Sequence, residues 1–204
     1  LNTTVDDTFE TATGWTVGWT GDNATTGIWV REDPVGTAAQ PEDDHTPGAG
    51  VRCWVTGNAA PGAALGTNDI DGGTTTLVSP TFNLSGSDVI YVSYWRWYSN
   101  NTGDSPNADT MPIQVSSNNG ATWVTLETVN ENAGTWVYKQ FLLNDYIPLT
   151  STVRFRFAAS DLGAGSLVEA GIDDFQLLAA ECVETTPGDI DGDGDVDGAD
   201  LGAL

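Results

Sequence analysis

Apolar and β-branched runs of five to ten residues alternate along the chain with clusters of Gly, Asn, Asp, Ser and Thr. The segment from Val153 to Phe157 shows a strict period of two, in which Val and Phe alternate with Arg154 and Arg156. A period of two sends alternate side chains to opposite faces of a β-strand. Signals for helices are nearly absent, so the pattern predicts an all-β protein.

The pattern predicts about eleven strands. We expect them over residues 5–10, 15–19, 27–31, 51–56, 74–79, 89–98, 111–116, 122–128, 136–143, 152–159 and 170–178. This number of short strands favours two packed antiparallel sheets, a β-sandwich of jelly-roll type. We assign the sandwich to residues 1–181, a linker to 182–188 and a calcium loop to 189–204.

Three local patterns refine this expectation. The run from Val89 to Tyr98 is apolar or aromatic on both faces, which predicts a central strand with its second face partly covered by a loop. Asn119-Gly120 supports a turn with positive φ, and its surroundings resemble an Asp-box hairpin of structural role. Arg154 and Arg156 are expected to pair with carboxylates on a neighbouring strand.

The charge excludes some partners. Six basic residues stand against 29 acidic ones, which gives a net charge of −23. Such a surface repels nucleic-acid phosphates and anionic lipids, and it attracts divalent cations. No apolar run reaches the ~18 residues that a membrane span needs. No signal peptide is visible, and the first residues read as a mature or trimmed start. A secreted, extracellular protein is expected from the calcium motif at the end of the chain, described next.

The end of the chain has the spacing of an EF-hand calcium loop that is cut off before its helix. Gly194 stands at loop position six, where the chain turns sharply, and Val196 can anchor the loop in an apolar contact. Calcium prefers six to eight oxygen ligands, which this spacing places around one ion. An acidic disordered tail is the alternative. The expected ligands are Asp189, Asp191, Asp193, Asp195, Asp197 and Asp200.

Three groups in the body also hold suitable oxygens for calcium. The first contains Asp69 and Asp71, and the second contains Asp104 and Asp109. The third joins the region of Glu10 to Asp173 and Asp174, because the first and last strands of a jelly roll are often neighbours. A bound cation would remove the repulsion between adjacent acids. Ordinary turn-forming Asp and Asn residues are the alternative.

Aromatic residues near loops are candidates for ligand binding. Trp15, Trp29 and Tyr98 could stack on sugar rings, although they could equally cap the ends of the sandwich. The tryptophans within predicted strands, which are Trp95, Trp97, Trp123 and Trp136, are expected in the core.

Two cysteines occur, Cys53 and Cys182. In an extracellular protein such a pair favours a disulfide bridge, and two separate buried thiols are the alternative.

Catalysis has little support. The one histidine, His45, cannot form a multi-histidine zinc site, and no nucleophile-elbow or zinc-protease pattern occurs. His45 is expected to be a solvated loop residue. With 29 acidic residues, a pair at glycosidase spacing would arise by chance. We therefore expect no enzymatic activity.

Several segments resemble the MAM-like and cleaved-adhesin-like jelly-roll modules of secreted bacterial proteins. They include residues 7–15, 77–86, 92–98, 115–120, 153–157 and 171–175. The resemblance implies a non-catalytic β-sandwich with structural calcium, and it marks Glu10 and Asp174 as the shared site. The C-terminal loop resembles one dockerin repeat and similar endings in planctomycete-like bacteria.

Two functions compete at this point. One is a secreted, calcium-stabilised binding or adhesion module for a glycan or protein, with an attachment segment at its end. The other is a structural protomer that assembles with copies of itself into an extracellular fibre or surface layer, because open head-to-tail contacts generate filaments.

Overall fold

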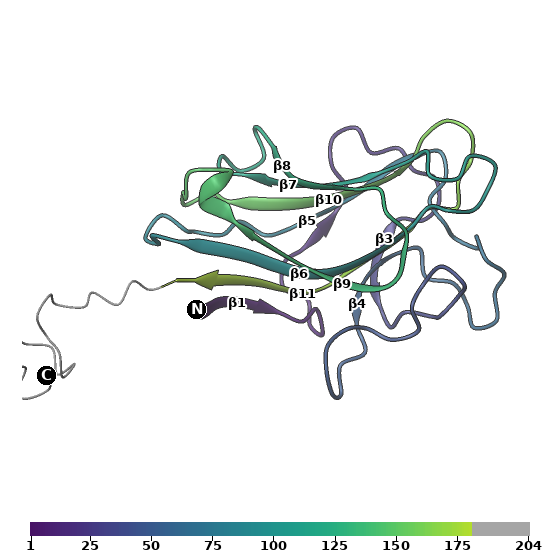
Figure 1. Ribbon diagram of the computed structural model, residues 1–204, viewed down its shortest axis with the longest axis horizontal. Coiled ribbons are helices and arrows are strands. Elements are labelled where there is room, and N and C mark those ends of the chain that lie inside the picture. Colours follow the sequence, from purple (N-terminus) through teal and green to yellow (C-terminus); the bar gives the residue numbers. More distant parts are fainter. Residues whose placement is uncertain (181–204) are drawn as a thin grey trace, which may run out of the picture.

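The computed structural model describes residues 1–180, and these form two antiparallel sheets packed face to face. Figure 1 shows the two layers, with β6, β9 and β11 in one and β5, β7, β8 and β10 in the other. The two-sheet β-sandwich expected from the alternating pattern is therefore confirmed. One short 3-10 helix, η1 (Leu143–Asp145), lies among the described residues, and no helix there is long and apolar enough to cross a membrane.

The larger sheet has six strands. Five follow the order β3-β4-β11-β6-β9, and the sixth, β1, pairs with residues 175–179 at the C-terminal end of β11. Their bounds are β1 (Asn2–Asp7), β3 (Trp29–Glu32), β4 (Cys53–Thr56), β6 (Ile90–Ser99), β9 (Ala133–Leu142) and β11 (Glu169–Ala179). The first and last strands are neighbours, as the jelly-roll expectation required, and Asp7 lies opposite Phe175.

The smaller sheet has five strands in the order β2-β5-β10-β7-β8. Their bounds are β2 (Thr16–Val17), β5 (Gly73–Val78), β7 (Met111–Ser116), β8 (Val124–Val129) and β10 (Arg154–Asp161). Every strand range predicted from the pattern overlaps one of these eleven strands. The largest shifts are at β1, which begins three residues earlier than expected, and at β9, which begins at Ala133 rather than near Trp136.

Aromatic side chains from both sheets fill the space between the layers. Phe155 and Phe157 of β10 are fully buried, and Phe155 packs edge-on against Phe175 of β11 at 5.1 Å between ring centroids. Trp15 joins them, with its ring 5.2 Å from those of Phe9 and Phe175. Burying a side chain of this size stabilises the fold by roughly 2–3 kcal/mol. The aromatic strands read from the sequence therefore make the core.

A buried ion pair links the two sheets. Arg96 of β6 is fully buried, and its guanidinium lies 3.0 Å from Glu127 of β8 and 2.8 Å from Glu131. The Tyr94 hydroxyl also donates to Glu127 at 2.9 Å. Arginine is the cation best suited to such a site, because its planar fork bonds two carboxylates at once. Sequence reasoning missed this pair because Arg96 stands among aromatic residues.

The outer face of the larger sheet is covered by a loop, as predicted for the strand that became β6. Cys53, Val55 and Trp97 form a second small cluster of buried side chains on this face. Gly171 permits the packing, since a Cβ there would lie 2.1 Å from Trp97 Nε1. His45, expected to be solvated, instead stacks on Trp95 at 3.6 Å between ring centroids.

Cys53 lies on β4, and its side chain is fully buried. Antiparallel pairing of Trp54 with Ile172 puts Cys53 level with Asp173. Its expected partner, Cys182, lies outside the described residues, so the disulfide remains a prediction.

Candidate functional site

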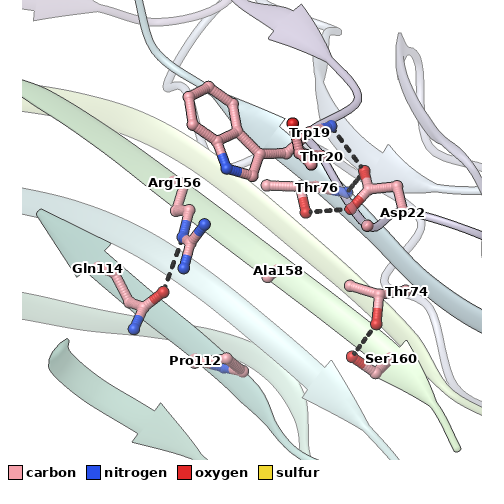
Figure 2. A pocket seen from close by; sticks show the side chains of 11 residues that line it. Trp19, Thr20, Asp22, Thr74, Thr76, Pro112, Gln114, Arg156, Ala158 and Ser160 are labelled. Carbon is pink, nitrogen blue, oxygen red and sulfur yellow. Dashed lines mark hydrogen bonds between the residues drawn. The ribbon is translucent and has the colours of Figure 1, made fainter. Parts of the chain in front are cut away.

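The outer face of the smaller sheet holds a depression of about 270 Å³ (Figure 2). Alternate residues of β10 build its floor, since the core takes Phe155 and Phe157 and leaves their neighbours pointing outward. The loop between β2 and β3 forms one wall. The lining residues are Trp19, Thr20, Gly21, Asp22, Thr74, Thr76, Pro112, Gln114, Arg156, Ala158 and Ser160.

Trp19 is the aromatic side chain of this depression, and its loop is held firmly. The Asp22 carboxylate accepts from Trp19 N at 3.0 Å, and from the backbone N and hydroxyl of Thr76 at 2.8 and 2.7 Å. Three donors on one carboxylate fix the loop to β5. Gly120, at φ +89°, lets the Trp19 ring approach, because a Cβ there would lie 2.6 Å from it. The partly buried indole is therefore preorganised beside the sheet.

Arg156 supplies hydrogen-bond donors to the same depression. Its Nε donates to Gln114 Oε1 at 2.7 Å, and its guanidinium lies 4.5 Å from the centre of the Trp123 ring. Burial lowers the pKa of this guanidinium, which nevertheless stays charged. Its two terminal nitrogens have no hydrogen-bond partner within residues 1–180, so they can donate to a ligand.

The expected pairing of these arginines with carboxylates is wrong for the described residues. No acidic side chain among residues 1–180 lies within ion-pair distance of Arg154 or Arg156. Arg154 donates to the Ser79 carbonyl at 2.9 Å and lies 5.7 Å from the Trp19 ring. The two guanidinium groups instead contact aromatic rings and neutral hydrogen-bond acceptors, because Trp19 and Trp123 flank this part of β10.

A second depression, of about 260 Å³, adjoins the first. Pro112 and Ser160 line both, so the two form one groove along the ends of β7 and β10. Asp109 and Leu162 lie at the far wall. The outer face of the smaller sheet thus offers two adjoining depressions, with the Trp19 ring in the first.

Acids of the third predicted calcium group lie beside the loop that contains Asp44 and His45. The Asp174 carboxylate lies 2.7 Å from His45 Nδ1 and accepts from the Thr46 hydroxyl at 2.8 Å. Burial and the neighbouring Glu10 raise the pKa of Asp44 to about 6, and Asp44 Oδ2 is buried without a partner. Phe9 and Asp174 have φ values of 58° and 46°, which are strained for residues other than glycine.

This group fits calcium chemically. It contains the carboxylates of Glu10, Asp44 and Asp174, and one oxygen of Asp44 is buried without a hydrogen-bond partner. Hard cations bind oxygen donors of this kind. Glu10 Oε1 also accepts from the backbone N of Val51 and Arg52, at 3.0 and 2.9 Å. Within residues 1–180, however, no three His, Cys, Asp or Glu side chains converge closely enough to form a ready-made metal site. A cation would therefore have to draw these acids together.

The other predicted metal ligands fall in different places. Asp69 is buried and lies level with Glu169 beside the Ile70–Val168 bridge, while Asp71 is exposed and accepts from the Thr26 hydroxyl at 2.9 Å. Burial and Asp71 raise the pKa of Asp69 to about 6. The two acids of the second predicted group lie in different surroundings, since Asp104 is exposed and Asp109 is buried. The expected ligands of the C-terminal loop lie outside the described residues.

The aromatic residues chosen for ligand binding are not on the surface. Trp15, Trp29 and Tyr98 are 8%, 2% and 0% exposed, and they belong to the core, so these three choices were wrong. Trp19, which sequence reasoning placed near a loop but did not select, faces the groove instead. Trp95, Trp123 and Trp136, expected in the core, are only partly buried. Strand position alone could not separate these cases, because both faces of the sheets hold aromatic residues.

The fold is similar to those of carbohydrate-binding modules and cleaved adhesin domains. The K1 cleaved adhesin domain of Lys-gingipain from Porphyromonas gingivalis W83 is similar with a TM-score of 0.53 and 15% identity, over 87% of this chain and 98% of that one. The K2 domain of Lys-gingipain has a TM-score of 0.51 and 18% identity, over 86% and 98%.

A structure of carbohydrate-binding modules from the β-sandwich superfamily, described as promiscuous in specificity, matches with a TM-score of 0.53 and 12% identity. The match covers 87% of this chain and 62% of that one. No protein-family profile and no curated protein matches the chain. The resemblance to cleaved-adhesin-like modules is confirmed as a likeness of fold.

Proposed function

We infer that this protein is a non-catalytic, secreted binding module that holds a glycan chain in the groove on the outer face of the smaller sheet. This proposal rests on the partly buried Trp19 ring, which lines the same depression as the unpartnered nitrogens of Arg156. Sugar rings present apolar C–H faces that stack on indole, and hydroxyl oxygens that accept from guanidinium groups.

The two adjoining depressions together favour a chain over a single sugar. They share Pro112 and Ser160 at their boundary on β7 and β10. Polar walls with one aromatic anchor suit a flat, hydroxyl-rich ligand better than an apolar one. The similarity in fold to carbohydrate-binding modules supports the same ligand class.

Calcium is part of the proposal as a structural ion. Glu10, Asp44 and Asp174 would hold it where β1 meets β11, and it would neutralise acids that otherwise repel one another. The His45 ring, stacked on Trp95, helps to fix the loop over these acids. The predicted calcium loop at residues 189–200 would add a second structural ion and an attachment segment.

Self-assembly into a fibre or surface layer remains the second hypothesis from the sequence. It requires a terminal strand that can pair with a neighbouring chain. In this structure β1 pairs with β11 of its own chain from Asn2 to Asp7, so β1 is already paired. No feature of the described residues favours this function over glycan binding.

The experiment is affinity electrophoresis of the full chain in gels containing galactan, xylan, mannan, β-glucan or pectin, followed by calorimetry with the polysaccharide that retards it. We expect retardation by at least one polysaccharide. Trp19→Ala should weaken binding by about 30-fold, because the truncation of a buried aromatic anchor costs about 2 kcal/mol.

Tyr138→Ala is the matched control. Tyr138 is 45% exposed on β9, in the other sheet, and it does not line the groove. This control should bind like the unaltered protein. Failure of every polysaccharide to bind, or equal losses for the two variants, would overturn the proposal.

A further inference from the structure

Four polar side chains gather between the two sheets at one end of the sandwich. Tyr98 and Asn100 stand at the end of β6, Asp109 precedes β7, and Asp161 ends β10. Strand alternation puts all four on the inward side, in step with Tyr94, Ile113 and Phe157. Their exposed fractions are 0%, 0%, 4% and 5%.

Several polar atoms of this group have no partner. Asp109 Oδ1 accepts from Leu162 N at 2.7 Å, whereas Asp109 Oδ2 is buried without any hydrogen bond. Asn100 Nδ2 donates to the Asp109 carbonyl at 2.8 Å, whereas Asn100 Oδ1 is equally orphaned. The Tyr98 hydroxyl is also unpartnered. Buried polar atoms in native proteins nearly always have partners, so these oxygens indicate a missing one.

The group also has no compensating positive charge. The basic partners of the ion pairs among residues 1–180 are His45, Arg96 and Lys139. None of them pairs with Asp109 or Asp161. Burial and the nearby carboxylates, Asp109 among them, raise the pKa of Asp161. Burial and Asp109 likewise raise the pKa of the Tyr98 hydroxyl. Two carboxyl groups thus lie close together in a space shielded from water.

We propose that Asp109, Asp161 and the side-chain oxygen of Asn100 bind a hard divalent cation of the calcium class. The two carboxylates neutralise the ion, and an asparagine carbonyl is a ligand that calcium accepts readily. Backbone carbonyls and water complete the six to eight oxygens that calcium requires. The site is separate from the acids at Glu10 and Asp174, and it does not depend on the proposed glycan binding.

Such an ion would support one wall of the groove. Asp109 and Leu162 line the second depression, and the hydrogen bond from Leu162 N to the Asp109 carboxylate joins two loops, residues 100–110 and 162–168. The bridge between Gly103 and Ser166 joins the same two loops. A cation held by Asp109 and Asp161 would fix this junction.

The test counts calcium ions in the full chain. The unaltered protein and the double variant Asp109→Asn, Asp161→Asn are stripped with EDTA and dialysed against buffered calcium, and bound calcium is measured by atomic emission. We expect the double variant to bind one equivalent fewer per chain. Asp104→Asn is the control, because Asp104 is an exposed acid of the same loop, and its calcium count should equal that of the unaltered protein.

Thermal unfolding adds a readout that does not depend on the count. In EDTA the double variant should melt at the same temperature as the unaltered protein or higher, because it lacks the repulsion between the acids. In calcium it should melt lower, because it lacks the ion. An unchanged calcium count would overturn the proposal. So would a double variant that is more stable in both conditions, since the two acids would then merely share a proton.

Discussion

Removal of the negative charge of Glu127 should destabilise the fold far more than removal of the same charge at Glu131. Both carboxylates bond the Arg96 guanidinium, but the Glu127 side chain is 13% exposed and the Glu131 side chain is 53% exposed. Arg96 itself is fully buried. Glu127→Gln would leave a buried cation with one solvent-exposed partner, and would weaken the acceptor of the Tyr94 hydroxyl.

Breaking a buried ion pair by removing one partner costs about 3–5 kcal/mol. Glu131 still faces Arg96 in the Glu127→Gln variant, so we expect the lower end, about 3 kcal/mol. An exposed pair is worth about 1 kcal/mol or less, and salt screens it. Glu131→Gln should therefore cost below about 1 kcal/mol, and this cost should shrink further in 0.5 M NaCl.

The assay is urea unfolding of both variants at pH 7 in saturating calcium, followed by tryptophan fluorescence. The free energy of unfolding in water comes from the linear extrapolation, and similar slopes would show that the same surface is exposed. Equal losses for the two variants, or a loss at Glu127 that disappears in high salt, would refute the view that Arg96 is a buried link between the sheets.

Three further predictions concern other residues. Burial and Asp69 raise the pKa of Glu169 from 4.5 to about 7, so the folded protein binds an extra proton in this range and loses stability as the pH rises from about 4.5 to 7. In EDTA, Glu169→Gln should therefore be more stable than the unaltered protein by about 3 kcal/mol at pH 8 and about 1 kcal/mol at pH 5.5; urea unfolding with a pH-independent difference would contradict this. Gly120→Ala should displace the Trp19 ring and weaken glycan binding, and the strain of alanine at positive φ should lower the free energy of unfolding by about 1–2 kcal/mol. An unchanged glycan affinity in calorimetry would contradict this prediction. Cys53 should be alkylated without reductant only after unfolding; protection until reductant is added would instead favour the predicted disulfide.

The fold could be read from the sequence because period-two alternation is a local property of each strand. Phe155 and Phe157 had to share a face whatever the rest of the chain did, and both are buried. The pairing of the first and last strands was also accessible, and it brings Asp7 opposite Phe175. The calcium site of Glu10 and Asp174 that was inferred from it stays a prediction. The short Asn118 hairpin kept its expected structural role, with Asn118 Oδ1 accepting from Thr122 N at 2.9 Å.

The groove could not be read in the same way. Which aromatic residue faces solvent depends on what the other sheet and the loops cover, and this is a tertiary property. Trp15 and Trp19 are four residues apart in similar surroundings, yet one is enclosed by Phe9 and Phe175 and the other faces the groove. The surroundings of Arg156 were misjudged for the same reason, because its neighbour Trp123 comes from a distant part of the chain.

The most direct test of glycan binding in the groove is a map of backbone amide chemical shifts as the retarding oligosaccharide is titrated into the full chain. We predict that the largest changes cluster at Gly21, Asp22, Thr76, Gln114 and Arg156, which line the first depression. Changes centred instead on the other sheet, around Trp95 and Tyr138, or no changes at saturating sugar, would contradict the account.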